Sequence, residues 1–286
     1  MNINFPFKVW LPKFFPIFKK LLMKKFLVIG NPIEHSLSPA LHNYLIKNNG
    51  INAIYEKLQL NEDELEQIIL QVKEKKIDGI NVTVPFKKAV IPYLDELSIE
   101  AESTQSVNTI SLKNNRVIGH NTDIFGFQTS IKKSEYNLEN KEILILGAGG
   151  VVPSIIFALT KMKPLKIMIS NRTKEKAENI KKLFKNIEII EWGKISNFDM
   201  IINATSLGLK KNDNLNLNFS SISKNFFFYD IIYNPSETNF LKIGKELGNK
   251  TLNGKLMFIY QAVSAFKIWH EKTPKIDENV IKLLDR

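Results

Sequence analysis

A continuous apolar run that leads into a glycine-rich turn constrains the fold of this chain more than any other feature. Residues Glu142 to Leu146 read EILIL, and Gly147-Ala148-Gly149-Gly150 follow them directly. An unbroken apolar run of this length is typical of a central strand in a parallel sheet, which is buried on both faces. Residues 151–160 are expected to form a helix, with Pro153 tolerated in its first turn. The segment therefore predicts a strand–turn–helix unit of an α/β fold.

The glycines of this turn predict a dinucleotide site. They allow a tight turn and a close approach of the backbone, while the amides at the start of the helix face the pyrophosphate. A glycine-rich turn alone is a weak signal, but here a strand precedes it and a helix follows it. The match to the pattern G-x-G-x-x-G is partial, because Val152 occupies the place of the third glycine.

The end of the next predicted strand, residues 166–170, indicates which dinucleotide is bound. Asn171-Arg172-Thr173-Lys174 follow it, with Lys176 close behind. An NAD site usually has Asp or Glu here, and such a carboxylate would repel a 2′-phosphate, which a guanidinium binds. We therefore predict NADP. A basic helix start without a ligand is the disfavoured alternative, because positive charge opposes the helix dipole.

The first half of the chain alternates strands and helices. Strands are expected at 26–30, 53–60, 79–84, 106–110 and 117–119, with helices at 39–49, 62–75 and 91–97. The dipeptide Asn114-Asn115 predicts a hairpin turn. Further strands are expected at 187–192, 199–204 and 226–233, followed by a helix at 237–247 and the final helices. The order predicts an α/β protein with two domains.

Lys87 stands just past the end of a predicted strand. The run from Gly79 to Val84 is rich in β-branched residues, and Pro85 ends it because proline cannot donate to a sheet ladder. Chemistry in α/β proteins occurs beyond such strand ends, where a lysine can hold an alcohol oxygen and exchange its proton. A lone lysine is usually solvated, so the other residues of the chain decide the role of Lys87.

Other polar residues flank predicted helices. Ser36 and Ser38 precede a helix start, where hydroxyls and free amides suit a carboxylate; helix capping by Ser38 is the alternative. Asp123 heads another helix, either as its cap or as a carboxylate that faces Lys87 across a cleft at a domain junction. Gln261 lies in an apolar stripe of the last helices, and surface placement is its alternative.

Composition bounds the class of function. The 286 residues suffice for two domains, and the absence of cysteine excludes a disulfide framework and a zinc–cysteine site and fits a reducing cytosol. The four histidines lack metal-ligand spacing, so we predict no metal. Six lysines in the first 25 residues reduce the net charge of the remainder from +11 to +5. This mild excess, without a basic aromatic face, favours an anionic substrate over nucleic acid.

Residues 1–22 are expected to be an extension. Prolines break any long helix there and lysines interrupt every apolar run, so we expect no transmembrane span. A secretory signal is disfavoured because the segment lacks a small-residue cleavage site. An arm that lies on a membrane surface is the alternative. Met23-Lys24-Lys25-Phe26 resembles a second start, directly before the first strand.

Taken together, the chain resembles the shikimate dehydrogenase family. The segments that carry the resemblance occur in the family's order and cover nearly everything from Met23 onward. They are Ser36–Pro39, Asn81–Lys87, Val107–Thr109, Gly119–Gly126, Gly147–Gly150, Asn171–Thr173, Asn203–Ser206, Tyr233–Pro235 and Gly254–Gln261. Each segment alone is unspecific, whereas the ordered set is highly specific.

The resemblance implies a cytoplasmic oxidoreductase that reversibly reduces 3-dehydroshikimate to shikimate with NADPH, in aromatic amino-acid biosynthesis. Residues 23–122 and 254–286 would form a substrate-binding and catalytic α/β domain with a mixed sheet, to which the C-terminal helices return. Residues 123–253 would form a Rossmann-type NADP-binding domain. The expected partner is the small-molecule substrate, without nucleic acid or stable membrane insertion, and a homodimer is left open.

The resemblance also implies residue roles. Lys87 and Asp123 would be the catalytic pair, with Lys87 as the proton-transfer group. The residues expected at the substrate are Ser36 and Ser38, which hold its carboxylate, with Thr83, Asn108, Tyr233 and Gln261. Those expected at NADP are Gly147, Ala148, Gly149, Gly150 and Val151 at the pyrophosphate, Asn171, Arg172, Thr173 and Lys176 around the 2′-phosphate, and Ile231 and Gly254 beside the nicotinamide.

One departure from the family pattern lies near the cofactor: Val151 and Val152 stand where alanine is common, which is expected to tighten the pocket. Two alternative functions stay open. The paired serines and Arg172 argue against an NAD-dependent quinate/shikimate dehydrogenase. The presence of both Lys87 and Asp123 argues against a non-catalytic nucleotide-binding regulator.

Overall fold

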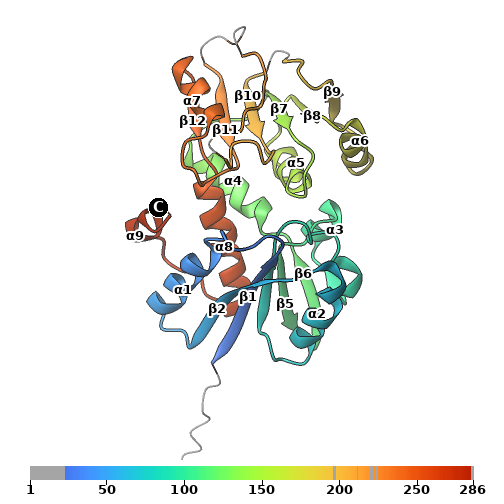
Figure 1. Cartoon of the computed structure of the whole chain (residues 1–286), viewed down its shortest axis with the longest axis vertical. Helices are drawn as coiled ribbons and strands as arrows, with labels where there is room; N and C mark the ends of the chain where they lie inside the picture. The colour runs from blue at the N-terminus through green and yellow to red at the C-terminus, as the bar shows by residue number, and fades with distance from the viewer. Residues whose placement is uncertain (1–22, 196–197, 211, 220–221, 223–224, 285–286) are drawn as a thin grey trace, which may run out of the picture.

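The computed structural model describes residues 23–284 except 196–197, 211, 220–221 and 223–224, so the extension predicted for residues 1–22 lies outside it. Two six-stranded sheets form two lobes. The helices α4 (Asp123–Lys133) and α8 (Lys255–His270) pack against each other between the lobes (Figure 1). This is the α/β architecture with two sheets that the sequence predicted.

The first sheet is mixed. It comprises, in spatial order, β2 (Ala53–Gln59), β1 (Lys24–Gly30), β3 (Gly79–Val82), β5 (Thr109–Lys113), β6 (Arg116–His120) and β4 (Glu96–Leu97). The strands β1, β2 and β3 are parallel, whereas β5 runs antiparallel to β3 and β6. The hairpin between β5 and β6 turns at Asn114 and Asn115, as predicted, and both have positive φ.

Helices cover both faces of the first sheet. They are α1 (Ser38–Asn48), η1 (Glu62–Glu64), α2 (Leu65–Lys73), η2 (Ile91–Tyr93), α3 (Ile99–Thr104) and, at the chain end, α9 (Glu278–Lys282). Along β1, Phe26 and Val28 pack with α1 and α8, while Leu27 and Ile29 pack with α2 on the other face. Because all four are at most 3% exposed, the strand reads as one apolar run.

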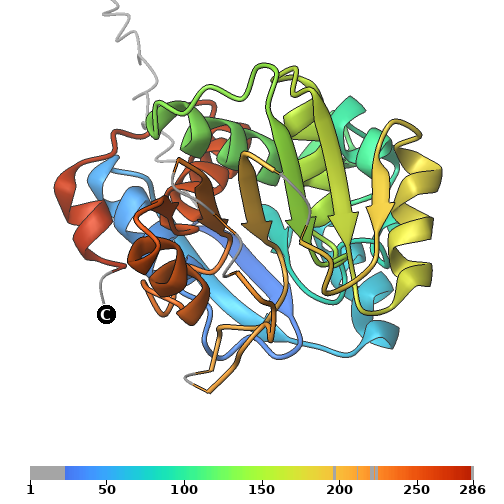
Figure 2. The same cartoon turned by 90° about the horizontal axis from the view of Figure 1, so that it is seen from above.

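The second sheet is parallel throughout (Figure 2). Its order is β12 (Lys250–Leu252), β11 (Phe227–Asp230), β10 (Met200–Asn203), β7 (Glu142–Leu146), β8 (Lys166–Ser170) and β9 (Glu188–Ile190). The helices α4, α5 (Val152–Thr160) and α6 (Lys174–Leu183) cover one face, and α7 (Asn239–Glu246) covers the other. The glycine turn follows β7, where the strand order reverses direction, which is where such folds bind ligands.

Several local predictions differ from the structure. The strand predicted at 106–110 lies at Thr109–Lys113, and the strand predicted at 226–233 ends at Asp230. The helix predicted at 91–97 is the single turn η2 followed by β4, because the N–H and carboxylate of Asp95 both pair with Val117 of β6. The helix α3 was not predicted. The strand β3 ends at Val82, two residues early, and Val84 is 61% exposed. Within the described ranges, no helix has both the length and the apolar character that a bilayer span needs.

Candidate functional site

Lys87 and Asp123 meet between the two lobes. Lys87 follows β3 and Asp123 is the first residue of α4, and Lys87 Nζ lies 2.5 Å from Asp123 Oδ2. Their side chains are only 12% and 9% exposed, so the ion pair is largely shielded from water. The other oxygen of Asp123 accepts a 2.8 Å hydrogen bond from Asn108 Nδ2. Of the two alternatives for Asp123, the structure therefore shows the carboxylate that faces Lys87. Its side chain does not cap α4.

Neighbouring residues hold Lys87 in place. Phe86 is 2% exposed in the core of the first sheet, and the N–H of Val107 donates to the carbonyl of Lys87 at 2.8 Å. A Cβ atom built on Gly150 would lie 4.0 Å from Cδ of Lys87. The Lys87 side chain thus reaches the glycine turn of the other lobe, and the ion pair and the turn share one region.

The two serines lie at the start of α1. Ser38 is its first residue and is 8% exposed, and its N–H donates to Ser36 Oγ at 3.3 Å. The helix is capped at Leu37 without a side-chain hydrogen bond, so Ser38 does not act as the helix cap. Both hydroxyls remain at a helix N-terminus, where the backbone favours an anion.

Tyr233 reaches the loop of the two serines, and Gln261 lies on α8 beside Phe258. The hydroxyl of Tyr233 accepts a hydrogen bond from the backbone N–H of Leu37, which lies between the serines, and burial raises its pKa to about 12. Its ring stacks on Phe258 at 4.2 Å. The half-buried Gln261 donates to the carbonyl of Phe258 at 2.9 Å, and Thr83 is half-buried beyond the end of β3.

Sequence reasoning missed two buried polar residues behind the site. The hydroxyl of Tyr55 donates to Asn81 Oδ1 at 2.7 Å, and Asn81 Nδ2 donates to the carbonyl of Asn108 at 3.0 Å. Burial raises the pKa of Tyr55 well above its usual value, although a hydrogen bond with Ser38 opposes the shift. Tyr55 and Asn81 therefore connect Ser38 to the residue that holds Asp123. A polar asparagine within a strand of apolar residues is the signal that points to Asn81.

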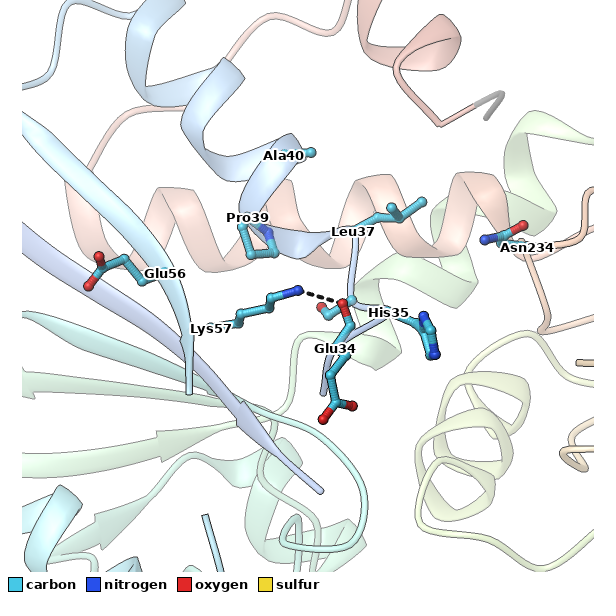
Figure 3. A pocket seen from close by; sticks show the side chains of 9 residues that line it. Glu34, His35, Leu37, Pro39, Ala40, Glu56, Lys57 and Asn234 are labelled. Atoms are coloured by element: carbon cyan, nitrogen blue, oxygen red, sulfur yellow. Dashed lines mark hydrogen bonds between the residues drawn. The ribbon is translucent and has the colours of Figure 1, made fainter. Parts of the chain in front are cut away.

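A surface hollow of about 630 Å³ lies beside the serines (Figure 3). The loop Glu34–Leu37 and Lys57 line one side, and Asn234 of the second lobe lines another. Lys57 Nζ donates to the carbonyl of Glu34, which ties β2 to this loop. Lys87 and Asp123 do not line the hollow, so the ion pair lies outside it.

The geometry of the glycine turn fits a pyrophosphate. Gly147 has φ +110°, and a Cβ there would lie 2.8 Å from the carbonyl oxygen of Ala204, so only glycine fits. A Cβ on Gly149 or Gly150 would meet nothing closer than 4.0 Å, which leaves open space beside the turn. Ala148 is half-buried, and Val151 directly precedes α5, whose first amides lack helical partners.

The residues beyond β8 fit a phosphorylated ribose. Arg172, Thr173 and Lys176 are exposed, and Asn171 Nδ2 donates to the carbonyl of Thr173 at 2.7 Å, which shapes the turn. Arg172 takes part in none of the ion pairs found among the described residues. Its guanidinium is thus available to an anion, and none of the residues 171–174 directly after the strand carries a carboxylate that would repel one.

Ile231 and Gly254 are packed together where α8 begins. A Cβ on Gly254 would lie 1.9 Å from the carbonyl oxygen of Ile231, which forces glycine at this position. The N–H of Gly254 donates to the carbonyl of Ile232 at 3.0 Å. Asp230, at the end of β11, accepts hydrogen bonds from the side chains of Asn203 and Thr238 and from the N–H of Ile232. These bonds fix the loop that carries Ile231.

Two protein-family models match the chain. The model of the shikimate dehydrogenase substrate binding domain matches residues 28–110, and the shikimate / quinate 5-dehydrogenase model matches residues 129–235. A shikimate dehydrogenase (NADP(+)) of Pelagibacter ubique is 60% identical over 264 residues, which cover 92% of this chain and 100% of that protein.

Solved structures show the same likeness. The crystal structure of shikimate dehydrogenase from Aquifex aeolicus is 39% identical, with a TM-score of 0.85 over 92% of this chain and 98% of that one. Shikimate 5-dehydrogenase from Thermus thermophilus, in complex with NADP(H) and shikimate, is 30% identical, with a TM-score of 0.84 over 92% and 99% of the two chains.

Proposed function

Because this chain belongs to the shikimate dehydrogenase family, we propose that it catalyses the reversible NADPH-dependent reduction of 3-dehydroshikimate to shikimate. The observation that carries the proposal is the ion pair of Lys87 and Asp123, 2.5 Å apart and next to the glycine turn. A structural ion pair needs no such neighbour, whereas a carbonyl reductase needs a proton donor beside its dinucleotide.

We propose the following roles at the reacting carbon. When bound, the nicotinamide supplies or accepts the hydride. Lys87 Nζ donates a hydrogen bond to the substrate oxygen and transfers the proton that this oxygen gains on reduction and loses on oxidation. Asp123 Oδ2 holds Nζ in position and shares its protons, while Asn108 fixes the carboxylate of Asp123.

The remaining contacts orient the substrate and the cofactor. Ser36 and Ser38 at the start of α1 would hold the substrate carboxylate, and Thr83, Asn108, Tyr233 and Gln261 would surround the ring. The turn Gly147–Val151 would hold the pyrophosphate, Ile231 and Gly254 would border the nicotinamide, and Asn171, Arg172, Thr173 and Lys176 would hold the 2′-phosphate. The open space at Gly149 and the exposed Arg172 support NADP.

We propose three further properties, which concern the domains, the compartment and the assembly. Residues 23–122 with 254–286, and residues 123–253, act as the substrate and the cofactor domain. The enzyme works in the cytoplasm, which the absence of cysteine supports. It forms a homodimer, which analytical ultracentrifugation tests.

The direct test is spectrophotometric assay of shikimate and quinate oxidation, each with NADP⁺ and with NAD⁺. We expect shikimate with NADP⁺ to have the highest kcat/KM, by on the order of tenfold or more. A higher kcat/KM with quinate and NAD⁺ would favour the quinate/shikimate alternative. No turnover with any pair would reject the proposed enzyme.

A further inference from the structure

Three consecutive residues of the first lobe contact the glycine turn, Lys87 and Asp123. Ser106 Oγ donates to the carbonyl of Gly150 at 3.1 Å, and the N–H of Val107 donates to the carbonyl of Lys87 at 2.8 Å. Asn108 Nδ2 donates to Asp123 Oδ1 at 2.8 Å. The segment between α3 and β5 thus binds the glycine turn, the backbone of the lysine and the carboxylate of its partner.

A second hydrogen bond between the lobes lies next to the first. Asn121, which directly follows β6, donates from Nδ2 to Ser154 Oγ on α5 at 2.8 Å and to the carbonyl of Ser106 at 3.0 Å. The helices α3 and α5 contact each other at this place, as Figure 1 shows. Both interlobe bonds therefore end on the strand–turn–helix unit that is proposed to hold the pyrophosphate.

The three side chains of this contact are buried, although Gly150 itself is exposed at the turn. Ser106 is 3% exposed, Asn121 is 6% exposed and Ser154 is fully buried. Hydrogen bonds in a shielded interior are stronger than at the surface, and a buried polar group that loses its partner is costly. These hydrogen bonds therefore favour one relative position of the two lobes at this contact. A displacement of the glycine turn would break the hydrogen bond of Ser106, which directly precedes Val107 and lies two residues before Asn108.

We propose that Ser106, Asn121 and Ser154 form an interlobe tether that positions the glycine turn against the Lys87–Asp123 pair and so couples cofactor binding to substrate binding. The inference rests on the proposed function. The three residues are positioning residues, because they bind Gly150 and each other while Val107 and Asn108 bind the catalytic pair. A cofactor that orders the glycine turn thereby orders Lys87. A substrate that orders Lys87 favours, in turn, the conformation of the glycine turn that binds the cofactor.

Such coupling is reciprocal and measurable. If shikimate tightens the binding of the dinucleotide by some factor, the dinucleotide tightens shikimate binding by the same factor, which in proteins is typically about 5- to 150-fold. NADPH with shikimate is the suitable pair, because both ligands are in the reduced state and the complex cannot turn over. The fluorescence of NADPH reports its dissociation constant with and without saturating shikimate.

The experiment compares the full chain with Ser106→Ala and Ser154→Ala, which remove one hydroxyl from each side of the contact. Ser111→Ala is the matched control. Ser111 is a buried serine of β5, and the hydrogen bond found for its Oγ among the described residues joins it to His120 of the same sheet. Thermal melting checks that each variant folds. Since the two serines belong to different lobes, one folded variant is enough to decide.

We expect shikimate to tighten NADPH binding at least about fivefold in the parent and in Ser111→Ala. In each tether variant this factor should fall at least about threefold, while the dissociation constant of NADPH alone stays nearly unchanged. The fold decrease in kcat should exceed the fold change in the KM for shikimate. The inference would be overturned if the folded tether variants kept the coupling factor of the parent, or if they lost equal NADPH affinity with and without shikimate. It would also be overturned if the parent showed no coupling. A parent that does not oxidise shikimate with NADP⁺ would instead reject the proposed function, and the inference with it.

Discussion

Asn108 holds Asp123 from the side opposite Lys87: Nδ2 of Asn108 donates to Oδ1 of Asp123 at 2.8 Å, and Oδ1 of Asn108 accepts from the N–H of Thr122 at 2.7 Å. Both partners are nearly buried, at 3% and 6% exposure. Asp123 is therefore oriented so that only Oδ2 faces Lys87. The orientation of the ion pair depends on an amide from the neighbouring strand segment.

Asn108→Ala should reduce both stability and turnover. It leaves the N–H of Thr122 and one oxygen of Asp123 without a buried partner, which costs about 1–3 kcal/mol of unfolding free energy. Because Asp123 is then free to rotate away from Lys87, kcat should fall by on the order of tenfold. Urea unfolding and steady-state assay measure the two effects.

Asn249→Ala is the control for that variant. Asn249 is 9% exposed and accepts from the N–H of Phe226 in the second lobe, away from the ion pair. It should lose unfolding free energy and keep kcat. An Asn108→Ala protein with parental kcat would contradict the assigned role.

Gly149→Ala should weaken NADP binding without destabilising the protein. The added Cβ would have no neighbour closer than 4.0 Å, so the free energy of unfolding should change by less than about 0.5 kcal/mol. The methyl group would instead occupy the space proposed for the pyrophosphate, and the KM for NADP⁺ should rise about tenfold. The KM for shikimate should stay close to that of the parent.

Gly254→Ala provides the contrast, because its Cβ would lie 1.9 Å from the carbonyl oxygen of Ile231 and must displace backbone. It should lower the melting temperature as well as activity. If Gly149→Ala destabilises the protein as much as Gly254→Ala does, the space beside the turn is not a ligand site.

The elements that the sequence predicted best are those with a local cause. The run EILIL followed by glycines identifies β7 and its turn, and Asn114-Asn115 identifies the hairpin. The short helix α3 escaped prediction because six residues carry little periodicity, although Ser98 accepts a capping hydrogen bond from the N–H of Ala101.

The contacts of the candidate site depend on sheet order, which local patterns do not contain. Strand ends and helix starts indicate Lys87 and Asp123 one at a time. Local reasoning paired them across 36 positions only as an alternative to helix capping, and the family resemblance favoured the pair. Tyr55 and Asn81 meet because β2 and β3 flank β1, and Ser106 meets Gly150 because α3 packs on α5. No sequence spacing or motif predicts these pairs of residues.

Arg172→Asp should change cofactor preference. Loss of the guanidinium and gain of a carboxylate that repels a 2′-phosphate should lower kcat/KM for NADP⁺ by on the order of a hundredfold. The kcat/KM for NAD⁺ should fall by less than about threefold, since NAD⁺ lacks that phosphate. Arg116→Asp is the matched control, because Arg116 is an exposed arginine on β6, paired with Glu96. Equal losses with both dinucleotides would contradict recognition of the 2′-phosphate.

Asp230 should make stability depend on pH. Burial raises the pKa of its carboxyl from 3.8 to about 6, so the folded state keeps a proton that the unfolded state has lost. Its contribution to the free energy of unfolding is present below about pH 4 and is lost as the pH rises through about 6, by up to about 3 kcal/mol.

The test is urea unfolding of the parent and Asp230→Asn at several pH values between about 4 and 8. As the pH rises, the parent should lose unfolding free energy relative to the variant. The variant removes this titration, whereas His42 and His270, whose pKa values burial lowers to about 3 and about 4, titrate equally in both proteins. A difference that is constant across the range would contradict the raised pKa.

The central claim is that Lys87 transfers the proton of the reacting hydroxyl, and the kcat of Lys87→Ala for shikimate oxidation with NADP⁺ tests it most directly. Lys87→Ala should bind shikimate within about tenfold of the parent, because the serines and Tyr233 remain, while kcat falls by on the order of a hundredfold or more. Turnover equal to that of the parent in a folded Lys87→Ala protein would contradict the account.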